Sequence, residues 1–198
     1  NNIFQDVGNY QNNTINPSLA ATWNFLESIL KDVAETFSYS LIHIGVDERP
    51  KNSWQGSPEL IDFMKKNKYQ SFDEVQDYFV NRIIKILKSF NKRTAAWNEA
   101  ALPPHNDIGS GGGAGSIDKN CLIFAWEHTS VVEQALKKGF ETVMCPGQFC
   151  YFDMAYNNST HERGICWAAT IEVSDIHAWQ PLNNIDPKYH FLVAGVQG

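Results

Sequence analysis

Apolar residues recur at helical spacing in four stretches of the chain, and short apolar runs with the length of buried strands lie between and after them. Residues typical of helix starts support these helices. Serine and asparagine side chains accept hydrogen bonds from the N–H groups of the first turn, and proline already has the backbone angle that the first turn needs. The predicted helices run from an Asn16 cap with Pro17 at the first position to Phe37, from Ser57-Pro58, from the capping box Ser71-x-x-Glu74, and over residues 130–139.

The apolar runs predict five strands, at residues 40–47, 94–99, 121–127, 141–146 and 190–196. Because helices lie between several of them, the strands are expected to pair in parallel. Because they show little polar alternation, both faces of the sheet are expected to be buried. The sequence therefore predicts an α/β fold.

Polar and aromatic clusters follow the ends of successive strands. They are Asp47-Glu48, Trp97-Asn98-Glu99, Trp126-Glu127-His128 and the segment from Gln148 to Asp153. Such clusters mark the catalytic face of a (β/α)8 barrel, whereas a doubly wound sheet would concentrate them at one switch point. A barrel typically needs about 250 residues, and five strands are found in 198 residues. We therefore expect residues 1–198 to form a single partial barrel domain, the later part of a TIM barrel.

Composition excludes several classes of function. With 43% hydrophobic residues and a net charge of −6, the chain can bury a core and has no basic surface that would favour nucleic acid. No apolar run approaches the length of about 20 residues that crosses a bilayer. The chain starts without methionine or a signal-like segment, so we expect it to be cut from a longer protein.

The cysteines Cys121, Cys145, Cys150 and Cys166 match no zinc spacing, so neither a metal nor another cofactor is expected. Two disulfides or free buried thiols both remain open. Three Asn-x-Ser/Thr sequons point outside the cytoplasm, to a periplasmic, secreted or lysosomal protein, without fixing the compartment. The sequons begin at Asn12, Asn157 and Asn158.

Asp47 and Glu48 stand side by side at the end of the expected strand 40–47. In an extended strand, His43, Gly45 and Asp47 share one parity and point inward, while Glu48 lies where a loop begins. Close carboxylates titrate apart, which suits a protonated acid catalyst beside a charged stabiliser. The alternative is a helix N-terminus or a loop whose acids face water.

The stretch from His43 to Glu48, "HIGVDE", resembles the His-x-Gly-Gly-Asp-Glu signature of the β-N-acetylhexosaminidases of glycoside hydrolase family 20. Trp54 soon after the acids, and further motifs in the family's order, extend the resemblance over nearly the whole chain. These motifs are "AAWNE", "FAWE", "YFD", "GICWAA" and "GVQ". Val46 departs from the signature's second glycine. On the parity argument it points away from the barrel axis and is absorbed by repacking.

The resemblance implies a retaining, substrate-assisted hydrolase that releases terminal β-linked N-acetylhexosamine. Glu48 would protonate the leaving oxygen, and Asp47 would orient the 2-acetamido group and stabilise an oxazolinium intermediate. The remaining implied site residues would form the pocket: Trp97, Trp126 and Trp167 as walls, Tyr151 as a donor to the acetamide oxygen, and Asp153 on a sugar hydroxyl. The implied ligand is an amino-sugar oligosaccharide or glycoconjugate.

The family also uses an arginine from the first barrel strand and a tryptophan and a glutamate from the end of the eighth. We therefore expect this chain to need the remaining strands of its own polypeptide, and to have little activity alone. Three alternatives stay open: a non-catalytic carbohydrate-binding barrel, a structural fragment that associates with further copies across open sheet edges, and a metal-dependent hydrolase that uses His43, Asp47 and Glu48.

Three further features are expected to have structural rather than catalytic roles. The glycine run at residues 109–116 lacks the Gly-Lys-Ser/Thr ending of a phosphate loop, so a flexible loop near the barrel mouth is expected. Four histidines are expected in loops or on the surface: His105, His128, His161 and His177. Trp23, within the first helical pattern, is expected in the core.

Overall fold

The structure, a computed structural model, describes residues 14–50, 53–103 and 110–198. The chain forms two compact units, Asn1–Cys121 and Leu122–Gly198, and each is described below by itself. The expectation that residues 1–198 form a single partial barrel domain stays a prediction.

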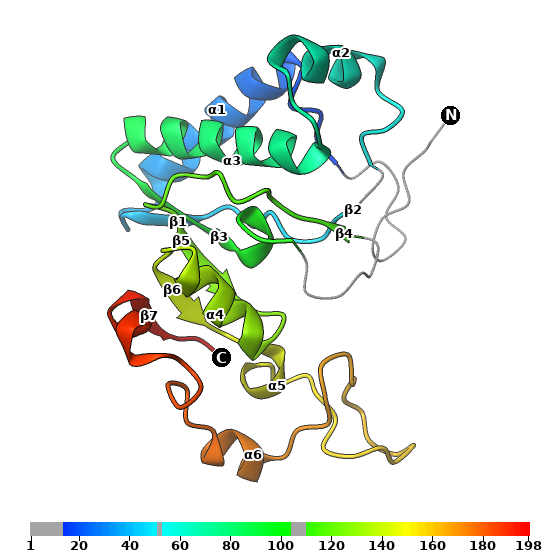
Figure 1. Ribbon diagram of the computed structural model, residues 1–198, viewed down its shortest axis with the longest axis vertical. Helices are drawn as coiled ribbons and strands as arrows, with labels where there is room; N and C mark the ends of the chain where they lie inside the picture. The colour runs from blue at the N-terminus through cyan, green and yellow to red at the C-terminus, as the bar shows by residue number, and fades with distance from the viewer. Residues whose placement is uncertain (1–13, 51–52, 104–109) are drawn as a thin grey trace. The chain divides into compact units, whose positions relative to one another are not determined.

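Two helices in unit 1 are layered on a parallel strand pair. β1 pairs in parallel with β3, with Leu41 opposite Arg93 and His43 opposite Ala95. α3 packs on β3, and α1 packs on α3 (Figure 1). The elements are α1 (Ala20–Thr36), β1 (Leu41–His43), β2 (Arg49–Pro50), α2 (Pro58–Asn67), α3 (Phe72–Ser89), β3 (Arg93–Trp97), the 3-10 turn η1 (Asn98–Ala100) and β4 (Ser110–Gly111).

Trp23 of the first predicted helix lies in the core, as expected, whereas Leu19, Ile29 and Phe37 of the same apolar pattern are exposed. Trp23 is 2% exposed and packs with Ile83 and Leu87 of α3. The start of α1 was predicted wrongly, since the helix begins at Ala20 rather than after Asn16. The Asn16 side chain instead accepts a hydrogen bond from the Ser18 backbone N–H at 3.0 Å, which stabilises a turn ahead of the helix.

The other two predicted helix starts in unit 1 are confirmed. The Ser57 hydroxyl accepts from the Leu60 N–H at 3.3 Å at the start of α2. The Ser71 hydroxyl accepts from the Glu74 N–H at 3.2 Å at the start of α3. Both bonds satisfy N–H groups that have no partner within the first helical turn.

Unit 2 contains three parallel strands. β6 lies between β5 and β7 and pairs with both, and α4 packs on β5 and β6 (Figure 1). The elements are β5 (Leu122–Ala125), α4 (Thr129–Lys137), β6 (Thr142–Met144), α5 (Gly147–Cys150), α6 (Val173–Ala178), the 3-10 turn η2 (Pro187–Leu192) and β7 (Val193–Val196). The parallel α/β pattern predicted from the sequence is therefore confirmed within each unit.

The histidines differ in their roles. His161 and His177 are exposed, as predicted, and His105 lies outside the described residues. His128 is the N-cap of α4, because its imidazole Nδ1 accepts from the Ser130 N–H at 3.1 Å. None of the four cysteines, all of which lie in the described residues, forms a disulfide, and Cys166 alone among them is exposed. Burial raises the pKa of Cys121 and of Cys145 to about 12, so both thiols stay protonated at neutral pH.

In the described ranges, no helix combines the length and the apolar character that a membrane crossing requires.

The glycine run is a packed segment where the structure describes it, and the expected flexible loop is wrong there. Ser110 and Gly111 pair antiparallel with Pro50 and Arg49, and the following two glycines are also buried. A Cβ at Gly112 would lie 2.1 Å from the Leu102 carbonyl oxygen, and one at Gly113 would lie 2.4 Å from the Ala100 carbonyl oxygen. Glycine is therefore required here for close backbone approach rather than for mobility.

This packing predicts that Gly112→Ala lowers the free energy of unfolding by about 1–3 kcal/mol, because the new methyl group must push backbone apart. Denaturant unfolding of the protein measures the change. Ala114→Ser, at an exposed position of the same run, is the control and should change stability by less than about 0.5 kcal/mol. Equal stability of Gly112→Ala and the control would contradict the close packing.

Candidate active site

The acid pair lies in a loop between β1 and β2 with unusual backbone angles. The expected strand 40–47 ends at His43, and Gly45, Val46 and Glu48 have φ values of 73°, 77° and 48°. The parity argument for the direction of Asp47 is therefore wrong, because residues 44–48 are not extended. In this loop Asp47 is exposed and Glu48 is half-buried.

Backbone hydrogen bonds tie this loop to the end of β3. The Ile44 N–H donates to the Ala95 carbonyl at 2.9 Å, and the Trp97 N–H donates to the Gly45 carbonyl at 3.0 Å. The Glu48 N–H points to the Glu99 carboxylate, with 3.4 Å between nitrogen and Oε1. The position of the acid loop is therefore fixed relative to the end of β3, which carries Trp97.

His43 supports the same turn. Its Nδ1 accepts from the Gly45 N–H at 3.2 Å, and its ring meets the Trp97 ring edge-on at a centroid distance of 4.7 Å. Desolvation lowers the pKa of His43, and the nearby Asp47 carboxylate, which favours the imidazolium, opposes this shift only in part. The neutral imidazole, whose Nδ1 can accept, is thus the favoured form.

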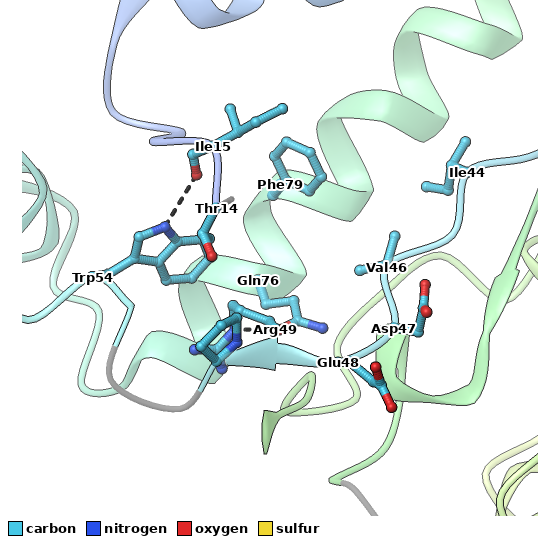
Figure 2. A pocket seen from close by; sticks show the side chains of 11 residues that line it. Thr14, Ile15, Ile44, Val46, Asp47, Glu48, Arg49, Trp54, Gln76 and Phe79 are labelled. Carbon is cyan, nitrogen blue, oxygen red and sulfur yellow. Dashed lines mark hydrogen bonds between the residues drawn. The ribbon is translucent and has the colours of Figure 1, made fainter. Parts of the chain in front are cut away.

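A pocket of about 250 Å³ opens beside the acid loop. Figure 2 shows Val46, Asp47 and Glu48 along one side of it, with Trp54 across from them and Phe79 of α3 behind. Trp54 is 4% exposed and donates from Nε1 to the Ile15 carbonyl at 3.0 Å. The pocket thus has an apolar wall and is bordered by the acid loop, whose Asp47 and Glu48 carboxylates point away from Trp54 in Figure 2.

Arg49, directly after the acids, is buried beneath the loop. It is 8% exposed, and its Nε donates to Gln76 Oε1 at 2.5 Å, while Nη2 donates to Asp73 Oδ1 at 2.7 Å. Gln76 in turn donates to the Glu99 carbonyl at 2.8 Å. Burial lowers the pKa of Arg49, and the Asp73 carboxylate opposes that shift.

Sequence reasoning missed Arg49 and Gln76, and it named Glu99 only as a member of the polar cluster at the end of the expected strand 94–99. One signal was available for Gln76, which lies four residues before Val80 and seven before Ile83 on the apolar stripe of α3. A polar residue at a stripe position needs a buried partner. No spacing in the sequence links Glu99 to the acid loop.

Unit 2 brings three of the predicted pocket residues together. The Trp126 and Trp167 rings lie 5.4 Å apart between centroids, and Tyr151 meets Trp167 edge-on at 5.0 Å and Trp126 at 6.3 Å. Trp167 is 44% exposed despite its size. A Cβ at Gly147 would lie 2.3 Å from the Trp167 ring, so only glycine permits this approach.

Asp153, the remaining predicted site residue, has an exposed side chain two residues beyond Tyr151. Its backbone carbonyl accepts from the Ile165 N–H at 2.9 Å, which fixes the loop that leads to Trp167. The structure thus gathers Asp47, Glu48 and Trp97 in unit 1 and the aromatic group in unit 2. That both groups face one sugar stays a prediction.

Val46 is the position where the sequence argument went furthest wrong. With φ at 77°, it occupies the left-handed region, which favours the glycine of the resembled signature and penalises a β-branched residue. Such a residue costs about 1–3 kcal/mol and persists only when surrounding contacts hold it. The substitution is therefore a source of backbone strain next to the acids, and not a matter of side-chain repacking.

Comparison with known proteins places the chain in a family. The family model described as glycosyl hydrolase family 20, catalytic domain, matches residues 3–198. A β-hexosaminidase of Vibrio furnissii is 30% identical over 179 residues, 90% of this chain and 28% of that protein. The β subunit of Homo sapiens β-hexosaminidase is 30% identical over 86 residues, 43% of this chain and 16% of that protein.

Solved structures agree. A family 20 exo-β-N-acetylglucosaminidase from Vibrio harveyi in complex with N-acetylglucosamine has a TM-score of 0.81 and 27% identity, and covers 95% of this chain and 28% of that chain. An inactive mutant of that enzyme has a TM-score of 0.82 with the same identity and coverage.

The chain therefore belongs to glycosyl hydrolase family 20, and its fold is part of a TIM-barrel catalytic domain. It spans 28% of the length of the Vibrio furnissii relative.

Strain at Val46 predicts that a glycine variant is more stable there than an alanine variant, which is the reverse of the usual order in a helix. Val46→Gly should be more stable than Val46→Ala by about 1 kcal/mol, because alanine keeps the Cβ that the left-handed region disfavours. At Lys85, an exposed position of α3, the Ala variant should instead exceed the Gly variant by about 1 kcal/mol. Chemical denaturation of the four variants measures both differences. The same order at both positions would argue against the strain.

Proposed function

We propose that the protein containing this chain is a β-N-acetylhexosaminidase that removes terminal β-linked N-acetylglucosamine or N-acetylgalactosamine. The observation that carries the proposal is the placement of two adjacent carboxylates, Asp47 and Glu48, in a fixed loop just beyond the carboxyl end of a parallel strand. Catalytic groups of barrel enzymes lie at this end of the strands. The names of the relatives, β-hexosaminidase and exo-β-N-acetylglucosaminidase, support the substrate class.

In the proposed mechanism the substrate supplies the nucleophile. The oxygen of its 2-acetamido group attacks the anomeric carbon, while Glu48 donates a proton to the leaving oxygen. The bond to the leaving group breaks, and a cyclic oxazolinium ion forms, whose positive charge Asp47 stabilises. Glu48 then takes a proton from water, which opens the ring and gives the product with retained configuration.

Different exposure of the two acids supports different roles. Glu48 is half-buried, whereas Asp47 is exposed, so the two carboxylates have different surroundings although they are adjacent in the sequence. Edge contact between His43 and Trp97 holds one tryptophan beside Asp47, at a place that suits a wall for the acetamido group.

The aromatic group of unit 2 supports the proposed sugar pocket. Trp126 and Trp167 offer apolar faces to the ring of the sugar, and Tyr151 offers a hydroxyl as a donor to the acetamide oxygen. Asp153 is exposed and available to bind a sugar hydroxyl.

Replacement of the acid tests this function. In a polypeptide that carries the whole barrel, Glu48→Gln should lower kcat on phenyl N-acetyl-β-glucosaminide by about 100-fold or more, because the amide cannot donate the proton. Binding of N-acetylglucosamine, measured by calorimetry, should change by less than about threefold. Glu59→Gln, a surface carboxylate on α2, is the control. Near-normal turnover of Glu48→Gln would refute the acid role.

The isolated chain should be a poor enzyme. We expect residues 1–198 to hydrolyse the same substrate at less than about 1% of the rate of the whole barrel, because positioning groups on other strands act together with the acids. Parallel assays of the two proteins at equal concentration measure this. A rate within about tenfold of the whole barrel, a difference near 1.4 kcal/mol, would show that the other strands are dispensable.

A further inference from the structure

We propose that Arg49 is a positioning residue for the proton donor: its guanidinium fixes the outgoing end of the acid loop and thereby the place of the Glu48 carboxyl. The inference rests on the proposed acid role of Glu48. It also gives a function to the glycine run, which the reaction itself does not use.

The acid loop needs an anchor at each end, because its backbone is held in disfavoured angles at Val46 and Glu48. At the incoming end, the Gly45 carbonyl accepts from the Trp97 N–H at 3.0 Å. Only three residues separate that bond from Arg49. A strained segment this short keeps its shape when both ends are fixed.

Arg49 is held from α3 and from Trp54. Its Nε and Nη2 donate to Gln76 at 2.5 Å and to Asp73 at 2.7 Å, and the guanidinium lies 4.7 Å from the centre of the Trp54 ring (Figure 2). The N–H groups of the guanidinium bind the two side chains of α3, and its planar face lies against the Trp54 ring. The two kinds of contact together fix the orientation of the group. At 8% exposure, the charge cannot leave this site for water without unfolding the loop.

The glycine strand closes the remaining side. Arg49 and Gly111 are paired residues of β2 and β4, and a Cβ at Gly111 would lie 2.1 Å from Arg49 Nη2. Gln76 also donates to the Glu99 carbonyl, and Glu99 Oε1 lies 3.4 Å from the Glu48 nitrogen. The guanidinium and the acid therefore share one frame, built from α3, β4 and the end of β3.

Misplacement of Glu48 should affect proton donation selectively. A phenyl leaving group needs a proton as its bond to the sugar breaks, whereas a 2,4-dinitrophenyl group leaves as a stable anion. A shift of about 1 Å in a catalytic group can cost about 100-fold. Loss of the anchor should therefore slow the phenyl substrate much more than the dinitrophenyl substrate, while general damage would slow both alike.

The experiment compares Arg49→Met, Asp73→Ala and Arg82→Met in the whole-barrel protein. For Arg49→Met we expect kcat/KM, which reports the steps up to departure of the leaving group, to fall by about 10- to 100-fold on phenyl N-acetyl-β-glucosaminide and by less than about threefold on the dinitrophenyl analogue. Asp73→Ala removes one anchor of the guanidinium, at a side chain that is 46% exposed, and should show the same pattern more weakly. If Arg49→Met does not fold, the Asp73→Ala variant alone tests the positioning role of Arg49.

Arg82→Met is the matched control, because Arg82, which lies on α3, also has its guanidinium over a tryptophan ring, that of Trp23 at 4.1 Å, and donates to the Tyr78 hydroxyl. It should leave the ratio of the two rates unchanged. Equal losses on both substrates, or no loss, in Arg49→Met and Asp73→Ala would overturn the proposal. Glu48→Gln separates the causes: if it too slows both substrates equally, the acid role fails and the positioning role with it.

Discussion

A buried guanidinium imposes the tightest constraint on unit 1. Arg49 carries a charge that is almost wholly removed from water. Its Nε and Nη2 donate to Gln76 and Asp73, while Nη1 has no hydrogen-bond partner among the described residues. Asp73 and Gln76 both lie in the first two turns of α3. The buried guanidinium also excludes any side chain at Gly111 and brings the glycine run against the loop as β4.

Strain and anchoring are two aspects of one arrangement around the acids. Left-handed backbone angles at Val46 and Glu48 let the chain turn within a few residues, so that two adjacent carboxylates reach the mouth side of β1. Hydrogen bonds from Ile44 and Trp97 on one side, and the Arg49 contacts on the other, supply the energy that holds this geometry. An extended strand would have sent the two side chains to opposite faces.

Unit 2 reaches its geometry by close approach of aromatic rings. Trp126 follows β5, Tyr151 follows α5, and Trp167 lies at the end of an irregular segment, yet their rings are in mutual contact. Gly147 permits this, since any larger residue would collide with Trp167. The residual exposure of Trp167 leaves an apolar surface available to a sugar ring, which suits the family to which the chain belongs.

The sequence by itself determined the parallel α/β class, the starts of α2 and α3, the burial of Trp23 and the candidate acids, because these follow from local spacing and capping. Tertiary structure alone decided the rest. It ended β1 at His43, moved the start of α1 to Ala20, and turned the glycine run into a packed strand. Positive φ angles, a buried charge and backbone contacts within van der Waals distance are set by residues far apart in the chain, so no local pattern records them.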